Sequence, residues 1–151
     1  MGIKQIIVDV DGVLTDGKQY IDHTGEKLFK AFNSRDIRAI REFVASGIDV
    51  ILVTADDWEG LKHWAFRVGA NIVVTRDKFQ YVKEMGFHHD ETVVVGDDAW
   101  DVEVLSWGRA YCPDNSDESV IDVYGICVMN SLGGEGVMAE LVRIAETEGW
   151  L

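Results

Sequence analysis

Short apolar runs alternate with segments of helical periodicity along most of the chain. The apolar runs are rich in β-branched residues and cover residues 3–10, 48–54, 71–75 and 92–96. Amphipathic segments with the spacing of α-helices cover residues 34–47, 58–69, 76–86, 100–108 and 136–150. Nearly continuous apolar strands separated by such helices are typical of a parallel sheet covered on both faces. The pattern therefore predicts an α/β fold with a Rossmann-like parallel sheet and helices on both faces.

Local signals support several of these helix boundaries. Gly47, Gly69 and Gly86 stand at the ends of three expected helices, where a left-handed C-cap favours glycine. Ser34 is the expected N-cap of the first helix, because its hydroxyl can accept a hydrogen bond from a free backbone N–H of the first turn.

One segment breaks the alternation of strand and helix. Residues 16–32, DGKQYIDHTGEKLFKAF, contain two short strand-like pieces around DHTGE, which predicts a β-hairpin inserted after the first strand. A hairpin at this point would stand over the carboxyl ends of the strands, where open α/β sheets bind ligands. We expect it to act as a flap on a single domain that spans residues 1–151.

Composition narrows the classes of partner. The 151 residues are 47% hydrophobic, which suits one ordinary domain, and no apolar run approaches the roughly 18 residues of a membrane helix. We expect a cytoplasmic protein that does not enter membranes. The formal net charge of −13 argues against nucleic acid and anionic membrane surfaces as partners. It still permits a small phosphorylated substrate, because a divalent cation can reverse the potential inside one cleft.

The stretch IIVDVDGVLTDG at residues 6–17 places Asp9 and Asp11 at the end of a strand that should be buried. Buried carboxylates need a cation, hydrogen bonds or a proton. Thr54 ends the second long strand, Lys78 begins a helix, and Asp97 follows a fourth strand. Since the carboxyl ends of parallel strands share one edge of a sheet, these groups are expected to converge on a divalent cation.

This set of residues suits phosphoryl transfer. Oxygen ligands from aspartates favour Mg²⁺. Asp9 can attack phosphorus to form an aspartyl-phosphate, and Asp11 can serve as general acid and base. Lys78 and the hydroxyl of Thr54 can hold the phosphoryl oxygens. We therefore predict that Asp9, Asp11, Thr54 and Lys78 are catalytic.

DVDGVLTDG, Thr54, Lys78 and GDDAWD resemble, in order, the four motifs of the haloacid dehalogenase-like phosphatases. FKAFNSRD at 29–36 and GGEGVMAEL at 133–141 resemble segments of the small branch of this family that lacks a cap domain. That branch is typified by 3-deoxy-D-manno-octulosonate 8-phosphate phosphatase and its sialic-acid-type relatives. The resemblance spans nearly the whole chain.

The resemblance implies a Mg²⁺-dependent phosphatase without a cap domain. Asp9, the carbonyl of Asp11, and Asp97 would be the metal ligands, and Asp98 or Asp101 would support the metal shell or orient Lys78. The implied substrate is a small phosphorylated sugar acid, either the eight-carbon 8-phosphate or a nonulosonate 9-phosphate. The resemblance also implies a homotetramer in which a neighbour's hairpin helps to close the site.

Some residues depart from the pattern of the branch. Asp56 stands where an arginine is common, and its charge would repel a sugar-acid carboxylate, although nonulosonate phosphatases can carry an acidic residue nearby. His63 and Trp64 lie in a stretch that is usually basic, and we expect them on a helix surface or subunit interface. Lys30, Arg35 and Arg67 remain, with Asp56, as candidate substrate-binding residues.

Two other functions stay open at this point. One is a non-catalytic oligomerisation module of a sialic-acid activation pathway, although retention of both Asp9 and Asp11 argues against a dead site. The other is a receiver-type phosphoacceptor domain, which the acidic cluster after Lys78 disfavours. The sequence GGEG at 133–136 is too short to bind phosphate by itself, and we expect a flexible turn there.

Overall fold

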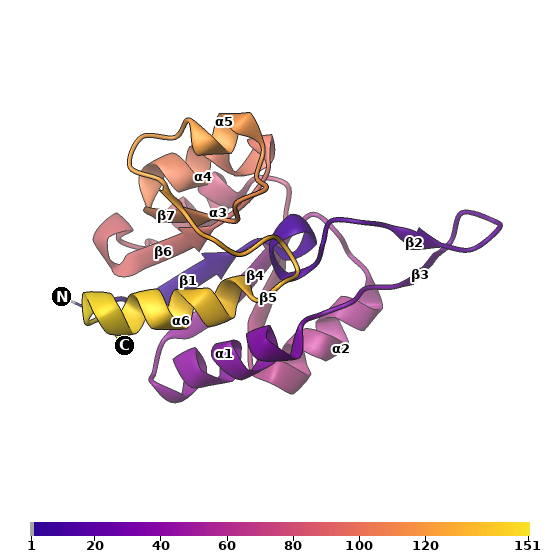
Figure 1. The fold of residues 1–151 in the computed structure, drawn as a ribbon, viewed down its shortest axis with the longest axis horizontal. Coiled ribbons are helices and arrows are strands. Elements are labelled where there is room, and N and C mark those ends of the chain that lie inside the picture. The colour runs from indigo at the N-terminus through magenta and orange to yellow at the C-terminus, as the bar shows by residue number, and fades with distance from the viewer. Residues whose placement is uncertain (1) are drawn as a thin grey trace.

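The computed structural model describes residues 2–151. Within them, six parallel strands form one sheet in the order β5-β4-β1-β6-β7-β8, drawn as arrows in Figure 1. The strands are β1 (Gln5–Val8), β4 (Asp49–Thr54), β5 (Asn71–Val74), β6 (Thr92–Val95), β7 (Arg109–Cys112) and β8 (Cys127–Val128). Strand β1 is central and pairs in parallel with β4 on one side and with β6 on the other. The predicted α/β class with a parallel sheet is confirmed.

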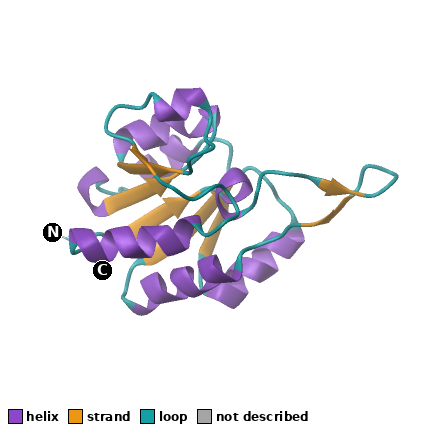
Figure 2. Ribbon diagram, viewed as in Figure 1, coloured by secondary structure: helices purple, strands orange, loops and turns teal. Residues whose placement is uncertain are grey.

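Helices cover both faces of the sheet, as Figure 2 shows. One face carries α1 (Ser34–Ala45), α2 (Glu59–Val68) and α6 (Val137–Glu148). The other carries α3 (Lys78–Glu84), α4 (Val102–Trp107) and α5 (Glu118–Ile121). Short helical turns lie at η1 (Val10–Leu14), η2 (His89–Glu91) and η3 (Ala99–Asp101). No helix in residues 2–151 is long and apolar enough to cross a membrane.

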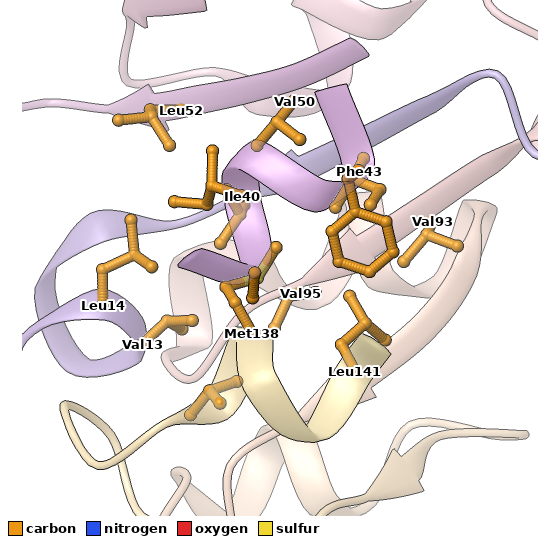
Figure 3. Packing of buried hydrophobic residues seen from close by; sticks show 14 of the residues in the cluster. Val13, Leu14, Ile40, Phe43, Val50, Leu52, Val93, Val95, Met138 and Leu141 are labelled. Carbon is orange, nitrogen blue, oxygen red and sulfur yellow. The ribbon is translucent and has the colours of Figure 1, made fainter. Parts of the chain in front are cut away.

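The core is divided by the sheet because successive side chains of a strand point to opposite faces. Ile6 and Val8 of β1 pack in the cluster under α1, α2 and α6, whereas Ile7 packs in the cluster under α3, α4 and α5. Figure 3 shows Ile40 and Phe43 of α1 packing near side chains of the sheet and of α6. This rigid centre fixes the position of the segment that leaves β1.

The strand order places a topological switch at β1. The chain moves from β1 outward through β4 to β5, then returns to β6 on the other side of β1. Open α/β sheets bind ligands at the carboxyl edge of such a switch. The hairpin of β2 (Tyr20–Ile21) and β3 (Lys27–Phe29) projects beyond the sheet at this edge (Figure 1), within the segment 16–32 where it was predicted.

Two local features differ from the expectations, and a third agrees with them. Strands β7 and β8 and helix α5 were not predicted, because their sequences RAYC, CV and ESVI contain neither a continuous β-branched apolar run nor a full amphipathic period. Asn33, not Ser34, caps α1: its side chain accepts a hydrogen bond from the backbone N–H of Arg35, and Ser34 already lies within the helix. Gly47, Gly69 and Gly86 all adopt positive φ near helix ends, as predicted.

Candidate active site

The segment after β1 turns sharply beneath the cleft. Asp11 and Gly12 have non-helical backbone angles inside the turn η1, and Gly12 has a φ of 88°, a region that favours glycine. A Cβ atom at Gly12 would lie 1.8 Å from Oδ2 of Asp97. The glycine therefore allows the Asp97 carboxylate to approach the backbone of this turn, next to Asp9 and Asp11.

Thr15 holds the turn together. Its side chain is 97% buried, and its hydroxyl donates to Oδ1 of Asp11 at 3.1 Å. The same oxygen accepts from the backbone N–H groups of Gly12 and Gly17 at 3.3 and 3.2 Å. These bonds fix both the backbone of the turn and the direction of the Asp11 side chain.

Asp9 and Asp97 form a crowded acidic pair. Burial raises the pKa of Asp9 to about 6, although the Lys78 ammonium opposes the shift. Burial, and then the neighbouring Asp9 carboxylate, raise the pKa of Asp97 to about 9. Burial is the largest cause of both shifts, because a carboxylate held away from water is costly to ionise, and neighbouring carboxylates add to it: Asp101 for Asp9, and Asp9 for Asp97. A cation between them would remove that cost.

The donor set at this point fits a divalent metal ion. Carboxylate oxygens of Asp9, Asp97 and Asp101 all lie within 4.8 Å of one another. Oδ1 of Asp97 is buried and has no hydrogen-bond partner among the described residues, which is unusual for a buried carboxylate oxygen. Hard oxygen ligands of this kind are those that Mg²⁺ prefers. Asp9 and Asp97 are the better candidate ligands, because both oxygens of Asp101 are already engaged.

Lys78 is anchored between two carboxylates. Its Nζ donates to Oδ1 of Asp9 at 2.8 Å and to Oδ1 of Asp101 at 2.5 Å. Burial lowers the pKa of Lys78, but Asp9 and Asp101 outweigh this effect and hold it above its usual value, so the amine is charged. Oδ2 of Asp101 accepts from the backbone N–H groups of Asp97 and Asp98. Asp101 is thus the residue that orients Lys78.

A second group of linked ion pairs connects Asp11 to Lys30, Asp56 and Lys27 in the cleft lining. Nζ of Lys30 lies 2.7 Å from Oδ1 of Asp11 and 2.9 Å from Oδ2 of Asp56. Asp56 also pairs with Lys27. Burial raises the pKa of Asp56, but the two lysines outweigh it and lower the pKa below its usual value. Asp56 is therefore ionised and neutralised, so it does not present the free negative charge that would repel a substrate carboxylate.

These groups line one open cleft of about 550 Å³. Within the described residues its lining contains five acidic side chains and five basic ones, namely Asp9, Asp11, Asp56, Asp98 and Asp101, and Lys18, Lys27, Lys30, Arg76 and Lys78. The cleft is thus close to neutral in a chain whose net charge is −13. A bound divalent cation would make it attractive to a small anion.

The structure brings most of the predicted site residues together. Asp9, Asp11, Thr54 and Lys78 line the cleft, as do Lys30 and Asp56. Thr54 is buried at the end of β4 and its hydroxyl accepts from the N–H of Asp56 at 3.0 Å. Arg35 and Arg67 are exposed on α1 and α2 and do not line the cleft, so their role in substrate binding stays a prediction.

Sequence reasoning did not find Arg76 and Trp100, which also line the cleft. Trp100 is a residue of the GDDAWD segment and Arg76 lies two residues before Lys78, and these positions are the only signals that could have suggested them. Trp100 is 82% exposed. His63 is exposed on α2, whereas Trp64 is half-buried and stacks on Phe32 with ring centroids 3.8 Å apart.

The expected turn at GGEG is present, and it packs tightly against the turn after β1. A Cβ atom at Gly133 would lie 2.0 Å from the carbonyl oxygen of Gly12, and one at Gly134 would lie 2.7 Å from the backbone nitrogen of Asp16. The N–H of Gly134 donates to the carbonyl of Val13 at 2.9 Å. The two glycines therefore pack directly on the turn that carries Asp11, and they are glycines because no side chain fits between the two backbones.

Comparison with known proteins gives a consistent result. The chain is 27% identical over 146 residues to the 3-deoxy-D-manno-octulosonate 8-phosphate phosphatase of Haemophilus influenzae, covering 92% of this chain and 80% of the relative. It is 50% identical over 52 residues to the Yersinia pestis phosphatase of the same name, a match that spans only 34% of this chain and 27% of that relative. No family model matches the chain.

Solved structures share the whole fold. The cobalt-bound phosphatase of Haemophilus influenzae superposes with a TM-score of 0.87 at 27% identity, covering 98% of this chain and 90% of that one. This chain is related to the haloacid dehalogenase-like phosphatases. A hydrolase of that superfamily from Legionella pneumophila has a TM-score of 0.86 at 28% identity, covering 97% of this chain and 84% of the other. The likeness to haloacid dehalogenase-like enzymes therefore extends over the sheet, the helices and the hairpin.

Proposed function

We propose that the chain is a Mg²⁺-dependent phosphatase that hydrolyses the phosphate ester of a small sugar acid through an aspartyl-phosphate on Asp9. The observation that carries this proposal is the close grouping of Asp9, Asp97 and the ammonium of Lys78 beneath an open cleft, with one buried oxygen of Asp97 left without a partner. Metal binding and anion binding both follow from that arrangement.

Asp9, Asp97 and the carbonyl of Asp11 would hold the ion. When bound, Mg²⁺ supplies positive charge that lets a phosphate dianion approach the aspartates. A cobalt-bound relative with the same fold supports a divalent ion at such a site, and the all-oxygen ligand set favours Mg²⁺.

The reaction then has two chemical steps, in which Asp9 is the nucleophile and Asp11 is the general acid and base. In the first, a carboxylate oxygen of Asp9 forms a bond to phosphorus while the bond from phosphorus to the ester oxygen breaks, and Asp11 gives its proton to the leaving alcohol. In the second, Asp11 takes a proton from water, which attacks the same phosphorus and frees Asp9 and inorganic phosphate. Lys78 and Thr54 hold the phosphoryl oxygens throughout.

The fixed geometry of Asp11 supports its assigned role. Its carboxylate accepts from the hydroxyl of Thr15 and pairs with Lys30, so it stays directed toward the cleft. Orientation of this kind contributes strongly to catalysis because the reacting groups need no rearrangement.

The relatives suggest the substrate. The two sequence relatives compared above are named phosphatases of 3-deoxy-D-manno-octulosonate 8-phosphate, and we propose either this eight-carbon compound or a nine-carbon nonulosonate 9-phosphate. The neutralised Asp56 is compatible with both. We also propose a cytoplasmic homotetramer, as the family resemblance implies; sedimentation at micromolar concentration tests the tetramer.

The test is release of inorganic phosphate from eight- and nine-carbon keto-sugar acid phosphates and from simple sugar phosphates, with and without Mg²⁺. We expect turnover on one sugar acid phosphate that chelation and Asp9→Asn both abolish. Asp114→Asn is a matched control, because it removes one carboxylate of the same size outside the cleft lining. A chain that releases no phosphate from any ester with Mg²⁺ would instead be the non-catalytic module, and one that retains a stable phosphoryl group would be a receiver-type domain.

A further inference from the structure

The basic residues that line the cleft differ in whether a carboxylate already holds them. Lys78 is bound by Asp9 and Asp101, Lys30 by Asp11 and Asp56, and Lys27 by Asp56. The remaining two cations of the lining are Lys18 and Arg76, and neither forms an ion pair with any residue in 2–151. The backbone N–H of Lys18 donates to Oδ1 of Asp16 at 2.9 Å and is the main cause that lowers the pKa of that carboxyl group, with a smaller contribution from the Lys18 charge. Of these two cations without an ion pair, only Arg76 carries a guanidinium, whose planar donors match the two oxygens of a carboxylate.

The backbone on which Arg76 stands is well fixed. The N–H of Thr75 donates to the carbonyl of Thr54 at 2.8 Å, which extends the pairing of β4 with β5. The hydroxyl of Thr75 accepts from the N–H of Asp77 at 3.2 Å, and Asp77 in turn caps α3 by accepting from Gln80. The guanidinium is therefore carried by a rigid turn two residues before Lys78, while its own side chain is exposed to solvent.

We propose that Arg76 is the specificity-determining residue that binds the carboxylate of the sugar-acid substrate at the mouth of the cleft. The inference rests on the proposed function, since it concerns the part of the substrate that remains outside the phosphoryl site. A sugar acid phosphate carries two anionic groups. Lys78, Thr54 and the metal site serve the phosphoryl group, so the second anion needs a cation that is not already neutralised, and a guanidinium can bind a carboxylate through two parallel hydrogen bonds.

This assignment differs from the candidates that the sequence offered. Arg35 and Arg67 do not line the cleft, and Lys30 is committed to two aspartates inside it. A lysine whose charge is matched by Asp11 and Asp56 adds little attraction for another carboxylate. Arg76 adds a full charge at the place where the cleft opens.

The kinetic test compares Arg76→Ala, Arg76→Lys and the wild type on 3-deoxy-D-manno-octulosonate 8-phosphate and on p-nitrophenyl phosphate, which has no carboxylate. We expect Arg76→Ala to raise KM for the sugar acid phosphate about 10- to 100-fold with kcat within about threefold. KM for p-nitrophenyl phosphate should stay unchanged, and Arg76→Lys should recover part of the loss. Arg38→Ala, which removes an exposed arginine of α1 outside the cleft, should match the wild type on both substrates.

A binding measurement separates this inference from the proposed function. Isothermal titration calorimetry would compare free 3-deoxy-D-manno-octulosonate with its uncharged methyl ester. If the wild type hydrolyses no ester yet binds the acid at least about tenfold more tightly than the methyl ester, and Arg76→Ala loses that preference, the inference stands while the phosphatase proposal fails. Equal losses on both substrates, no loss with Arg76→Ala, or no preference for the acid over its ester would overturn it.

Discussion

Replacing Gly133 by alanine tests whether the glycine-rich segment positions the catalytic turn. The added Cβ would lie 2.0 Å from the carbonyl oxygen and 2.7 Å from the carbonyl carbon of Gly12. Ordinary contacts of a Cβ atom begin at about 3.4 Å, so one of the two backbones must move by more than about 1 Å. Gly133 has no positive φ, which means that the effect is one of contact alone and not of backbone strain.

The displaced backbone belongs to the turn that carries Asp11 and contacts Asp97. A shift of about 1 Å in a reacting group can cost about 100-fold in rate, and overpacking of this kind typically costs about 1–3 kcal/mol of stability. We therefore expect Gly133→Ala to fold, to unfold at a lower urea concentration, and to show a kcat lower by about two orders of magnitude. Phosphate release under saturating substrate, with circular dichroism on the same samples, measures both effects.

Gly108→Ala provides the matched control. Its Cβ would lie 2.7 Å from a side-chain carbon of Val94, so the substitution also overpacks the interior, but it does so outside the cleft lining. It should lose stability and keep its kcat. If Gly133→Ala retained the wild-type kcat, or if Gly108→Ala lost as much activity, the segment would not position the catalytic turn.

Three further substitutions probe the charges of the fold and the site. Asp36 of α1 is 99% buried, and its carboxylate accepts a hydrogen bond from the backbone N–H of Met138 in the first turn of α6. Burial raises the pKa of Asp36 from 3.8 to about 6. The wild type therefore loses stability as the pH rises from about 4 to above 6, because the folded protein must give up a proton that the unfolded chain has already lost. The unfolding free energy of Asp36→Asn, measured relative to wild type, should rise by about 1.4 kcal/mol between about pH 5 and about pH 7.5. A difference that does not change with pH would contradict this. Lys78→Met should lower the unfolding free energy in urea without divalent ions by about 3 kcal/mol, because buried Asp101 loses its cation; an unchanged midpoint would refute the pairing. Asp97→Asn should abolish the rise in melting temperature that Mg²⁺ gives the wild type, and an undiminished rise would place the ion elsewhere.

The sheet and most of the helices could be predicted because their patterns are long and regular. The run at residues 48–54 is buried on both faces of the sheet and is almost continuously apolar, whereas the helix at 34–47 buries one apolar face with helical spacing, and both patterns are easy to recognise. Strand β8 has two residues, both exposed, and its place depends on pairing with β7, a tertiary contact that no local pattern records. The N-cap at Asn33 was missed for a similar reason, because Asn33 and Ser34 are both good caps and only the backbone geometry decides between them.

The candidate site likewise has features that the sequence predicts and contacts that only the folded structure reveals. Asp9, Asp11, Thr54 and Lys78 could be brought together from the sequence because each follows a strand or begins a helix at the same edge of the sheet. The pairing of Asp56 with Lys27 and Lys30 could not, since it depends on where the hairpin lies relative to the end of β4. The packing of Gly133 on Gly12 joins residues that are distant in the chain, and a glycine pair alone does not distinguish a flexible turn from a close backbone contact.

The most direct test of the account is to trap the phosphoryl group on the protein. Excess enzyme would be mixed with 3-deoxy-D-manno-octulosonate 8-phosphate and Mg²⁺, quenched in acid during a single turnover, and analysed by mass spectrometry of its peptides. We predict that the phosphoryl group is found on Asp9 in the wild type and on no residue in Asp9→Asn. Complete release of phosphate with no phosphorylated peptide at any quench time, or a phosphoryl group on Asp11 or Asp97, would contradict the assignment of Asp9 as the nucleophile.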